Sequence, residues 1–143
     1  MATTLAAALS PERREQLFPK LTPAQIKRIA AVGKPRQVDG GQMLIHQGDA
    51  TVPFFVVISG EIEILQPTAN GELPITNHLA GEFTGEVNML SGRRSLVCAR
   101  MKEAGEVIQL DRHGLQTLVQ TDVELSEILM RAFIFAHQIP WEI

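Results

Sequence analysis

The chain has 143 residues, of which 45% are hydrophobic and 20% charged, and 16 acidic against 13 basic residues give a net charge of −3. This length suits one domain with its own core, and the acidic balance argues against a protein that coats nucleic acid. The single cysteine excludes an internal disulfide and a metal site built from cysteines alone, and no apolar run reaches the roughly 20 residues that span a bilayer.

Residues 1–35 are predicted to be helical. Ser10–Pro11 is a helix start, because serine accepts hydrogen bonds from first-turn amides and proline lacks the N–H that would stay unpaired there. Thr22–Gln25 repeats this signal with glutamine at the capping-box position, and Gly33 and Pro35 end the segment. Between these signals, apolar residues recur at helical spacing at Ile26, Ile29, Ala30 and Val32. We therefore expect two short helices here.

Residues 36–111 are predicted to form strands. Short runs of Val, Ile, Leu and Phe are separated by Gly, Asp, Asn and Pro at intervals of roughly ten residues, which is typical of a sandwich or barrel. Asn70–Gly71 predicts a hairpin, because both residues tolerate positive φ, and Gly48–Asp49 and Gly60 mark further turns. The expected strands are Gln42–His46, Phe54–Ser59, Glu61–Leu65, Pro74–Leu79, Ser95–Met101 and Glu106–Leu110.

Residues 112–143 return to helix. Asp111 is the expected cap of a short helix, and Thr121–Glu124 reads as a capping box that opens a longer helix to about His137. Helices do not alternate with the strands, so a parallel α/β sheet is not expected. The predicted fold is mainly β with flanking α, an antiparallel β-barrel with N-terminal and C-terminal helices.

Residues 81–95 interrupt the strand pattern with a short predicted helix, Glu86–Leu90, that follows Gly85. A helix that begins after a glycine offers free backbone N–H groups to an anion, which can approach closely. The adjacent pair Arg93–Arg94 leads into the next strand, where one of the two guanidinium groups can grip the same anion at two points. Glu86 would repel a bare phosphate unless it bound hydroxyl groups, so the segment indicates a phosphorylated sugar.

The run from Phe83 to Ser95 resembles the phosphate-binding cassette of the cyclic nucleotide-binding domains, an F-G-E followed several residues later by R-(S/A)-A. Two positions differ, since Thr84 stands between phenylalanine and glycine, and Leu96 replaces the usual alanine. Upstream, residues 38–49 and 54–64 are similar to strands of the same family, and the resemblance covers about residues 15–135. It implies a jelly-roll barrel over residues 36–111, with the cassette at residues 81–95.

The resemblance also implies a role for each residue of the site. Glu86 would bind the ribose 2′-hydroxyl, Gly85 would allow close approach, and backbone amides of the short helix, including Val87, would complete the phosphate cradle. Arg94 would pair with the cyclic phosphate, and the Ser95 hydroxyl would add a contact. The expected ligand is cAMP, cGMP or a similar phosphorylated nucleotide, with no cofactor.

The predicted protein is a cytoplasmic, non-enzymatic sensor over residues 1–143 that signals through its last helix. That helix carries a broad apolar band, which suits contact with a second copy or an effector domain. The sequence looks closest to regulatory domains fused to bacterial thioredoxin-reductase-like flavoproteins. No segment is left for a helix-turn-helix, so direct nucleic-acid binding is not expected, and neither is membrane contact.

Two alternatives to a ligand sensor remain open. One is a ligand-free docking or dimerisation domain of a redox flavoprotein, in which the cassette serves packing alone. The other is a cupin-like metalloprotein, although the histidines lack ligand spacing and are predicted to lie at the surface or to be hydrogen-bonded. These are His46, His78, His113 and His137. Cys98 lies in a predicted strand and is expected to be buried.

Overall fold

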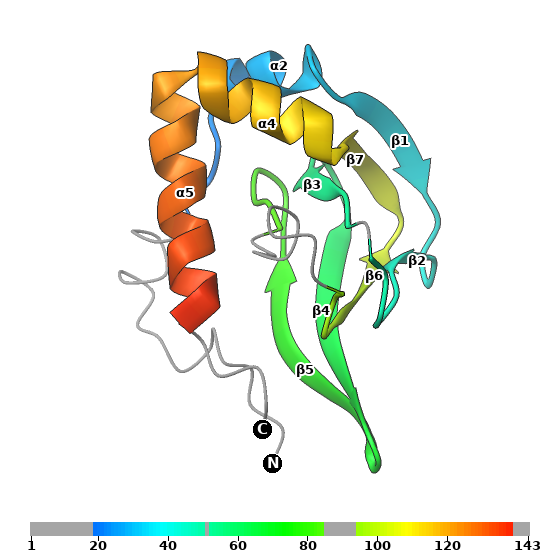
Figure 1. Ribbon diagram of the computed structural model, residues 1–143. Coiled ribbons are helices and arrows are strands. Elements are labelled where there is room, and N and C mark those ends of the chain that lie inside the picture. The colour runs from blue at the N-terminus through cyan, green and yellow to red at the C-terminus, as the bar shows by residue number, and fades with distance from the viewer. Residues whose placement is uncertain (1–18, 51, 85–93, 139–143) are drawn as a thin grey trace.

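The computed structural model describes residues 19–50, 52–84 and 94–138, in which the strands form two antiparallel sheets (Figure 1). The three-stranded sheet has the order β1-β7-β3, with β1 Lys34–Val38, β7 Gly105–Leu110 and β3 Phe54–Val57. The four-stranded sheet has the order β2-β6-β4-β5, with β2 Met43–Ile45, β6 Cys98–Glu103, β4 Glu61–Thr68 and β5 Gly71–His78. The predicted fold class is confirmed, with the strands divided between two sheets instead of one closed barrel.

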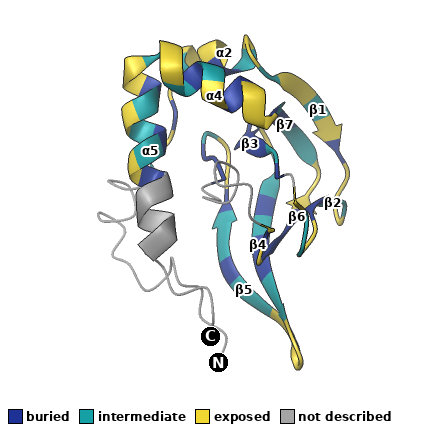
Figure 2. Cartoon of the chain, viewed as in Figure 1, coloured by how far each residue is buried: buried dark blue, intermediate teal, exposed yellow. Residues whose placement is uncertain are grey.

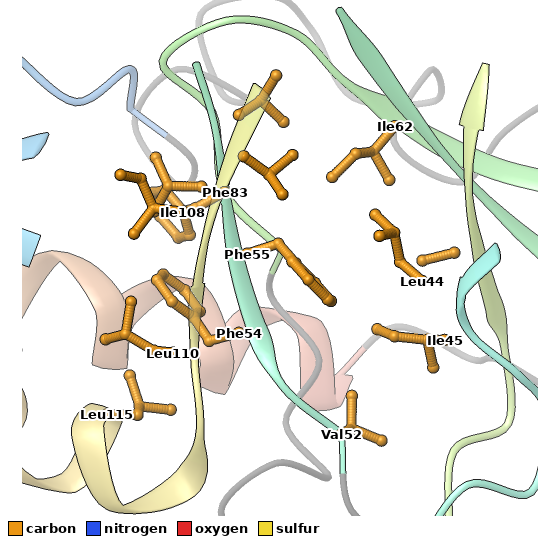
Figure 3. Packing of buried hydrophobic residues seen from close by; sticks show 14 of the residues in the cluster. Leu44, Ile45, Val52, Phe54, Phe55, Ile62, Phe83, Ile108, Leu110 and Leu115 are labelled. Carbon is orange, nitrogen blue, oxygen red and sulfur yellow. The ribbon is translucent and has the colours of Figure 1, made fainter. Parts of the chain in front are cut away.

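Strand β3 lies at the centre of the molecule, and all four of its residues are buried. Figure 3 shows Phe54 directed toward Leu110 and Leu115 on the helix side, and Phe55 directed toward Leu44 on the side of the four-stranded sheet. Because adjacent strand residues point to opposite faces, β3 contributes to both packing layers. In contrast to β3, strand β1 and the tip of the β4–β5 hairpin are largely exposed (Figure 2).

All six predicted strands are present, but the sequence did not predict β1. Pro35 was interpreted as a helix terminator, whereas it lies inside β1 and pairs with Ile108 of β7. Proline cannot donate a hydrogen bond to a neighbouring strand, so it is tolerated at a sheet edge, and β1 ends the three-stranded sheet. The β4–β5 hairpin is confirmed, with Thr68 paired to Gly71, whose φ is +120°.

Three helices follow the predicted signals in the described residues: α2 Pro23–Ala30, α4 Arg112–Thr121 and α5 Val123–Gln138. The capping box of α2 is confirmed, since Thr22 Oγ1 accepts from the Gln25 N–H at 3.2 Å and Gln25 Oε1 accepts from the Thr22 N–H at 2.9 Å. Asp111 caps α4 by accepting from the Gly114 N–H at 2.7 Å.

The predicted start of the last helix is wrong by one residue. Thr121 ends α4, and its hydroxyl donates to the Thr117 carbonyl at 2.7 Å. Asp122 instead precedes the first turn of α5, and its Oδ1 accepts from the Leu125 N–H at 3.0 Å. The helix predicted from Ser10–Pro11 lies outside the described residues. No helix in the described part of the chain has both the length and the apolarity to cross a membrane.

Candidate functional site

The segment that leads into the cassette, residues 81–84, runs along the outer edge of β3. The Val57 N–H donates to the Glu82 carbonyl at 2.9 Å, and the Thr84 N–H donates to the Phe55 carbonyl at 3.0 Å. An isolated antiparallel bridge joins Val56 to Phe83 between these two bonds. The backbone just before Gly85 is therefore fixed on β3, a fully buried strand at the end of the three-stranded sheet.

Buried side chains strengthen this attachment. The Phe83 ring is 1% exposed and lies 5.9 Å from the ring of Phe54, measured between centroids. Thr84 is equally buried, and its Oγ1 accepts from the Phe55 N–H at 3.1 Å. The residue that departs from the family pattern thus satisfies a buried backbone donor. Glu82 is buried as well, and its Oε1 accepts from the Leu79 N–H at 2.5 Å.

The segment that leaves the cassette is held by the loop between β2 and β3. The Gly48 N–H donates to the Ser95 carbonyl at 2.8 Å, and the Ser95 N–H donates to the Asp49 carbonyl at 2.9 Å. The exposed Arg94 side chain donates from Nη1 to the Gly48 carbonyl at 2.9 Å, which orients the guanidinium over this loop. Gly48 has a φ of +90°, a conformation that glycine adopts without strain.

The structure places two of the five predicted site residues. Arg94 and Ser95 lie together beside Gly48, whereas Gly85, Glu86 and Val87 lie outside the described residues, as does the predicted helix Glu86–Leu90. The Ser95 hydroxyl is buried and occupied locally, because it donates to the Val97 carbonyl at 2.9 Å and accepts from the Val97 N–H at 3.3 Å. It stabilises the turn that leads into β6.

Sequence reasoning marked Gly48–Asp49 only as a turn and did not assign it to the site. The Gly-Asp pair predicts a tight turn, but its contact with Ser95 joins segments far apart in the chain. Asp49 also accepts from the His46 N–H through Oδ2 at 2.9 Å, which shapes the loop from within. The loop and the cassette exit therefore form one hydrogen-bonded unit.

The described residues offer little to a metal ion. No group of three His, Cys, Asp or Glu side chains that could hold a metal occurs within them. His46 and His113 are exposed, and His78 is buried, with His46 and Asp49 4.0 Å apart between Nδ1 and Oδ2. The His137 side chain lies outside the described part. Cys98 is buried, as predicted.

The predicted output helix, α5, is joined to α2 by charged side chains at its first turn. Arg28 Nε lies 2.8 Å from Asp122 Oδ2, and Arg28 Nη2 lies 2.7 Å from Glu124 Oε1. The Leu125 N–H and then Arg28 lower the pKa of Asp122, since both stabilise its carboxylate. Gln25 and Arg28 likewise lower the pKa of Glu124.

Comparisons with known proteins agree with this architecture. A model of the family described as "Cyclic nucleotide-binding domain" matches residues 35–122. The cGMP-dependent protein kinase egl-4 of Caenorhabditis briggsae is 31% identical over 108 residues, which cover 72% of this chain and 14% of the kinase. Potassium channel AKT1 of Oryza sativa subsp. indica is 26% identical over 91 residues, which cover 64% of this chain and 10% of the channel.

Solved structures share the fold at low sequence identity. The Thermus thermophilus catabolite activator protein superposes with a TM-score of 0.67 at 22% identity, over 82% of this chain and 55% of that protein. A structure described under "A cyclic-GMP-dependent signalling pathway regulates bacterial phytopathogenesis" gives a TM-score of 0.70 at 24% identity, over 84% and 97% of the two chains. These likenesses show the fold.

Proposed function

Because the chain belongs to the cyclic nucleotide-binding domain family, we propose that it is a regulatory domain that binds cAMP or cGMP at residues 81–95 and signals through α5. Domains of this family are typically regulatory and not catalytic. The proposal treats residues 1–143 as one such domain and requires no cofactor. Among its relatives, the kinase egl-4 is cGMP-dependent by name, which supports cGMP as one of the two candidate ligands.

The observation that carries the proposal is the anchoring of both ends of the cassette. Residues 81–84 are bonded to β3, and Arg94 and Ser95 are bonded to the Gly48–Asp49 loop. A segment fixed at both ends can present backbone N–H groups to a ligand at little cost in entropy. The exposed guanidinium of Arg94 adds the positive charge that a cyclic phosphate requires.

In this proposal each site residue has one role. Arg94 pairs with the cyclic phosphate, Glu86 binds the ribose 2′-hydroxyl, and the amides at Gly85 and Val87 cradle the phosphate. Ser95 supports the site chiefly by position, because its hydroxyl is bonded to Val97. A hydroxyl contact from Ser95 to the phosphate would add to these bonds.

Titration calorimetry with cAMP and with cGMP tests the proposal on wild type, Arg94→Ala and Lys34→Ala. Lys34 is an exposed cation on β1, so its variant controls for loss of one positive charge. We expect wild type and Lys34→Ala to bind alike and Arg94→Ala to bind about 10- to 100-fold more weakly, the usual effect of losing a hydrogen bond to a charged group. Absence of heat from wild type at millimolar nucleotide would end the proposal.

Signalling is proposed to pass through α5 to an effector domain or a second copy of the chain. The buried residues of α5, Leu125, Leu129 and Ala132, join the core of the domain. Val123, the first residue of the helix, is 77% exposed and available to a partner. Sedimentation of wild type and Val123→Asp, each with and without nucleotide, tests whether association depends on this end of α5.

A further inference from the structure

In the part of the chain that the structure describes, one buried side-chain oxygen has no hydrogen-bond partner. Gln66 lies near the end of β4, and its Oε1 is buried without a hydrogen-bond partner among the residues that the structure describes. Nearly all buried polar side-chain atoms in proteins are hydrogen-bonded, because an unpaired acceptor forfeits the bond that it made to water. No group in the described part of the chain satisfies the oxygen of Gln66.

The strand pattern places Gln66 on the inner face of the four-stranded sheet. Ile62 and Ile64 belong to the buried core, and residues at alternate positions of a strand share a face. Pairing with β6 is regular here, with Ile64 opposite Ala99 and Leu65 opposite Cys98. The register with β5 shifts between Ile64 and Leu65, but the residue left without a partner, Ile75, lies on β5. The alternation along β4 therefore puts the partly buried Gln66 on the same side as the two isoleucines.

The same register places Gln66 beside the cassette exit. The printed pairing of β4 with β6 ends at Leu65 opposite Cys98, and because the strands are antiparallel the chain continues to Gln66 on one side and to Val97 on the other. Val97 is hydrogen-bonded to Ser95, the neighbour of Arg94. An amide oxygen without a partner among the described residues therefore lies on the strand that leads toward the segment carrying the proposed phosphate partner.

We infer that Gln66 recognises the base of the bound nucleotide, by accepting a hydrogen bond from an amino group of a purine. This inference rests on the proposed function. When the phosphate is held at Arg94, the base lies on the side of the ribose away from the phosphate. A purine amino group there would supply the donor that Gln66 Oε1 does not find among the described residues. The amide also carries a donor beside its acceptor, and glutamine pairs with adenine in this two-point manner.

Calorimetry with matched nucleotides tests the inference on wild type, Gln66→Met and Gln116→Met. The probes are cAMP and its 6-deamino analogue, and cGMP and its 2-deamino analogue, cyclic inosine monophosphate. Methionine keeps the length of the side chain but removes its amide donor and acceptor, and Gln116 is an exposed residue of α4 that controls for the substitution.

We expect wild type and Gln116→Met to bind the amino form of the preferred nucleotide about 5-fold more tightly than its deamino analogue, the typical effect of one hydrogen bond. Gln66→Met should lose this preference and bind the deamino analogue as wild type does. An unchanged preference in Gln66→Met overturns the inference while leaving the proposed function intact. Failure of wild type to bind any of the four nucleotides overturns both.

Thermal unfolding of the ligand-free proteins supplies a second test. Because Oε1 has no partner to lose among the described residues, Gln66→Met should unfold at the same temperature as wild type or at a higher one. A lower unfolding temperature would show that Gln66 makes a stabilising bond in the free protein, and this result would overturn the inference.

Discussion

Arg28 of α2 lies 2.8 Å from Asp122, the residue that caps α5, measured from Nε to Oδ2. Arg28 also contacts Glu124 of α5. Glu124 Oε1 accepts a further hydrogen bond from Gln25 Nε2 of α2 at 2.9 Å. The first described helix and the last one are thus joined at the turn where α5 begins. Any change in the direction of α5 must stretch or break these contacts.

Removing the guanidinium should weaken this junction. We expect Arg28→Met to lower the thermal unfolding temperature by about 1–3 °C at low salt, because exposed ion pairs contribute little individually. The decrease should shrink in 1 M NaCl, where such pairs are screened. Lys27→Met removes the same charge from the neighbouring position of α2 and serves as control. Equal decreases in both variants would contradict a specific role for Arg28.

Acid should weaken the same junction. The pKa values of Asp122 and Glu124 are lowered in the folded protein, so their contribution to stability is present above the unfolded-state values. It is lost as pH falls below about 4 and through the folded values. Unfolding temperatures measured from pH 6 to 3 should fall less steeply for Arg28→Met than for wild type. Parallel curves would show that Arg28 does not set these pKa values.

Thr84 should stabilise the approach to the cassette through its hydroxyl. Thr84→Val keeps the shape but leaves the buried Phe55 N–H without its acceptor, so urea unfolding should show a loss of about 1–3 kcal/mol. Thr84→Ser retains the hydroxyl and should lose clearly less. If valine and serine were equally destabilising, the hydrogen bond would not be the cause.

Alanine substitutions at Gly60 and Gly41 distinguish the cost of backbone strain from the cost of steric crowding. Both have positive φ, +82° and +85°, so alanine is strained at either position. A Cβ at Gly60 would lie 2.6 Å from the Glu103 carbonyl oxygen, whereas at Gly41 it meets no described atom within 4 Å. Gly41→Ala should therefore cost about 1–2 kcal/mol and Gly60→Ala distinctly more, as measured by urea unfolding. Equal costs would mean that the chain near Glu103 yields easily.

Local signals in the sequence predicted the elements, and the exceptions have physical causes. The Thr22–Gln25 capping box and the Asp111 cap depend on contacts within one turn, which sequence shows directly. The last helix has two adjacent capping residues, and the structure selects Asp122 because Arg28 also binds it. Strand β1 was missed because the tolerance of proline depends on its place at a sheet edge.

The candidate site was less predictable than the fold. Arg94 could be named from its motif, but the Gly48 loop that orients it is reached only through long-range backbone bonds. Gln66 carries no motif at all. Its significance depends on sheet register and on the absence of a hydrogen-bond partner in the described structure, neither of which sequence reveals.

The prolines at the sheet margins have a consequence for association between molecules. Pro35 lies in β1, between the charged residues Lys34 and Arg36, and Pro74 lies in β5, at the end of the other sheet. Strand β7 pairs with one edge of β3, and residues 81–84 are hydrogen-bonded to its other edge. Exposed strand edges are where chains add to one another and form fibrils, and proline and lysine oppose this. The remaining edge strand, β2, is 3 residues long, and very short edge strands are poor templates for strand addition. The described sheet edges should therefore resist growth into extended β-aggregates.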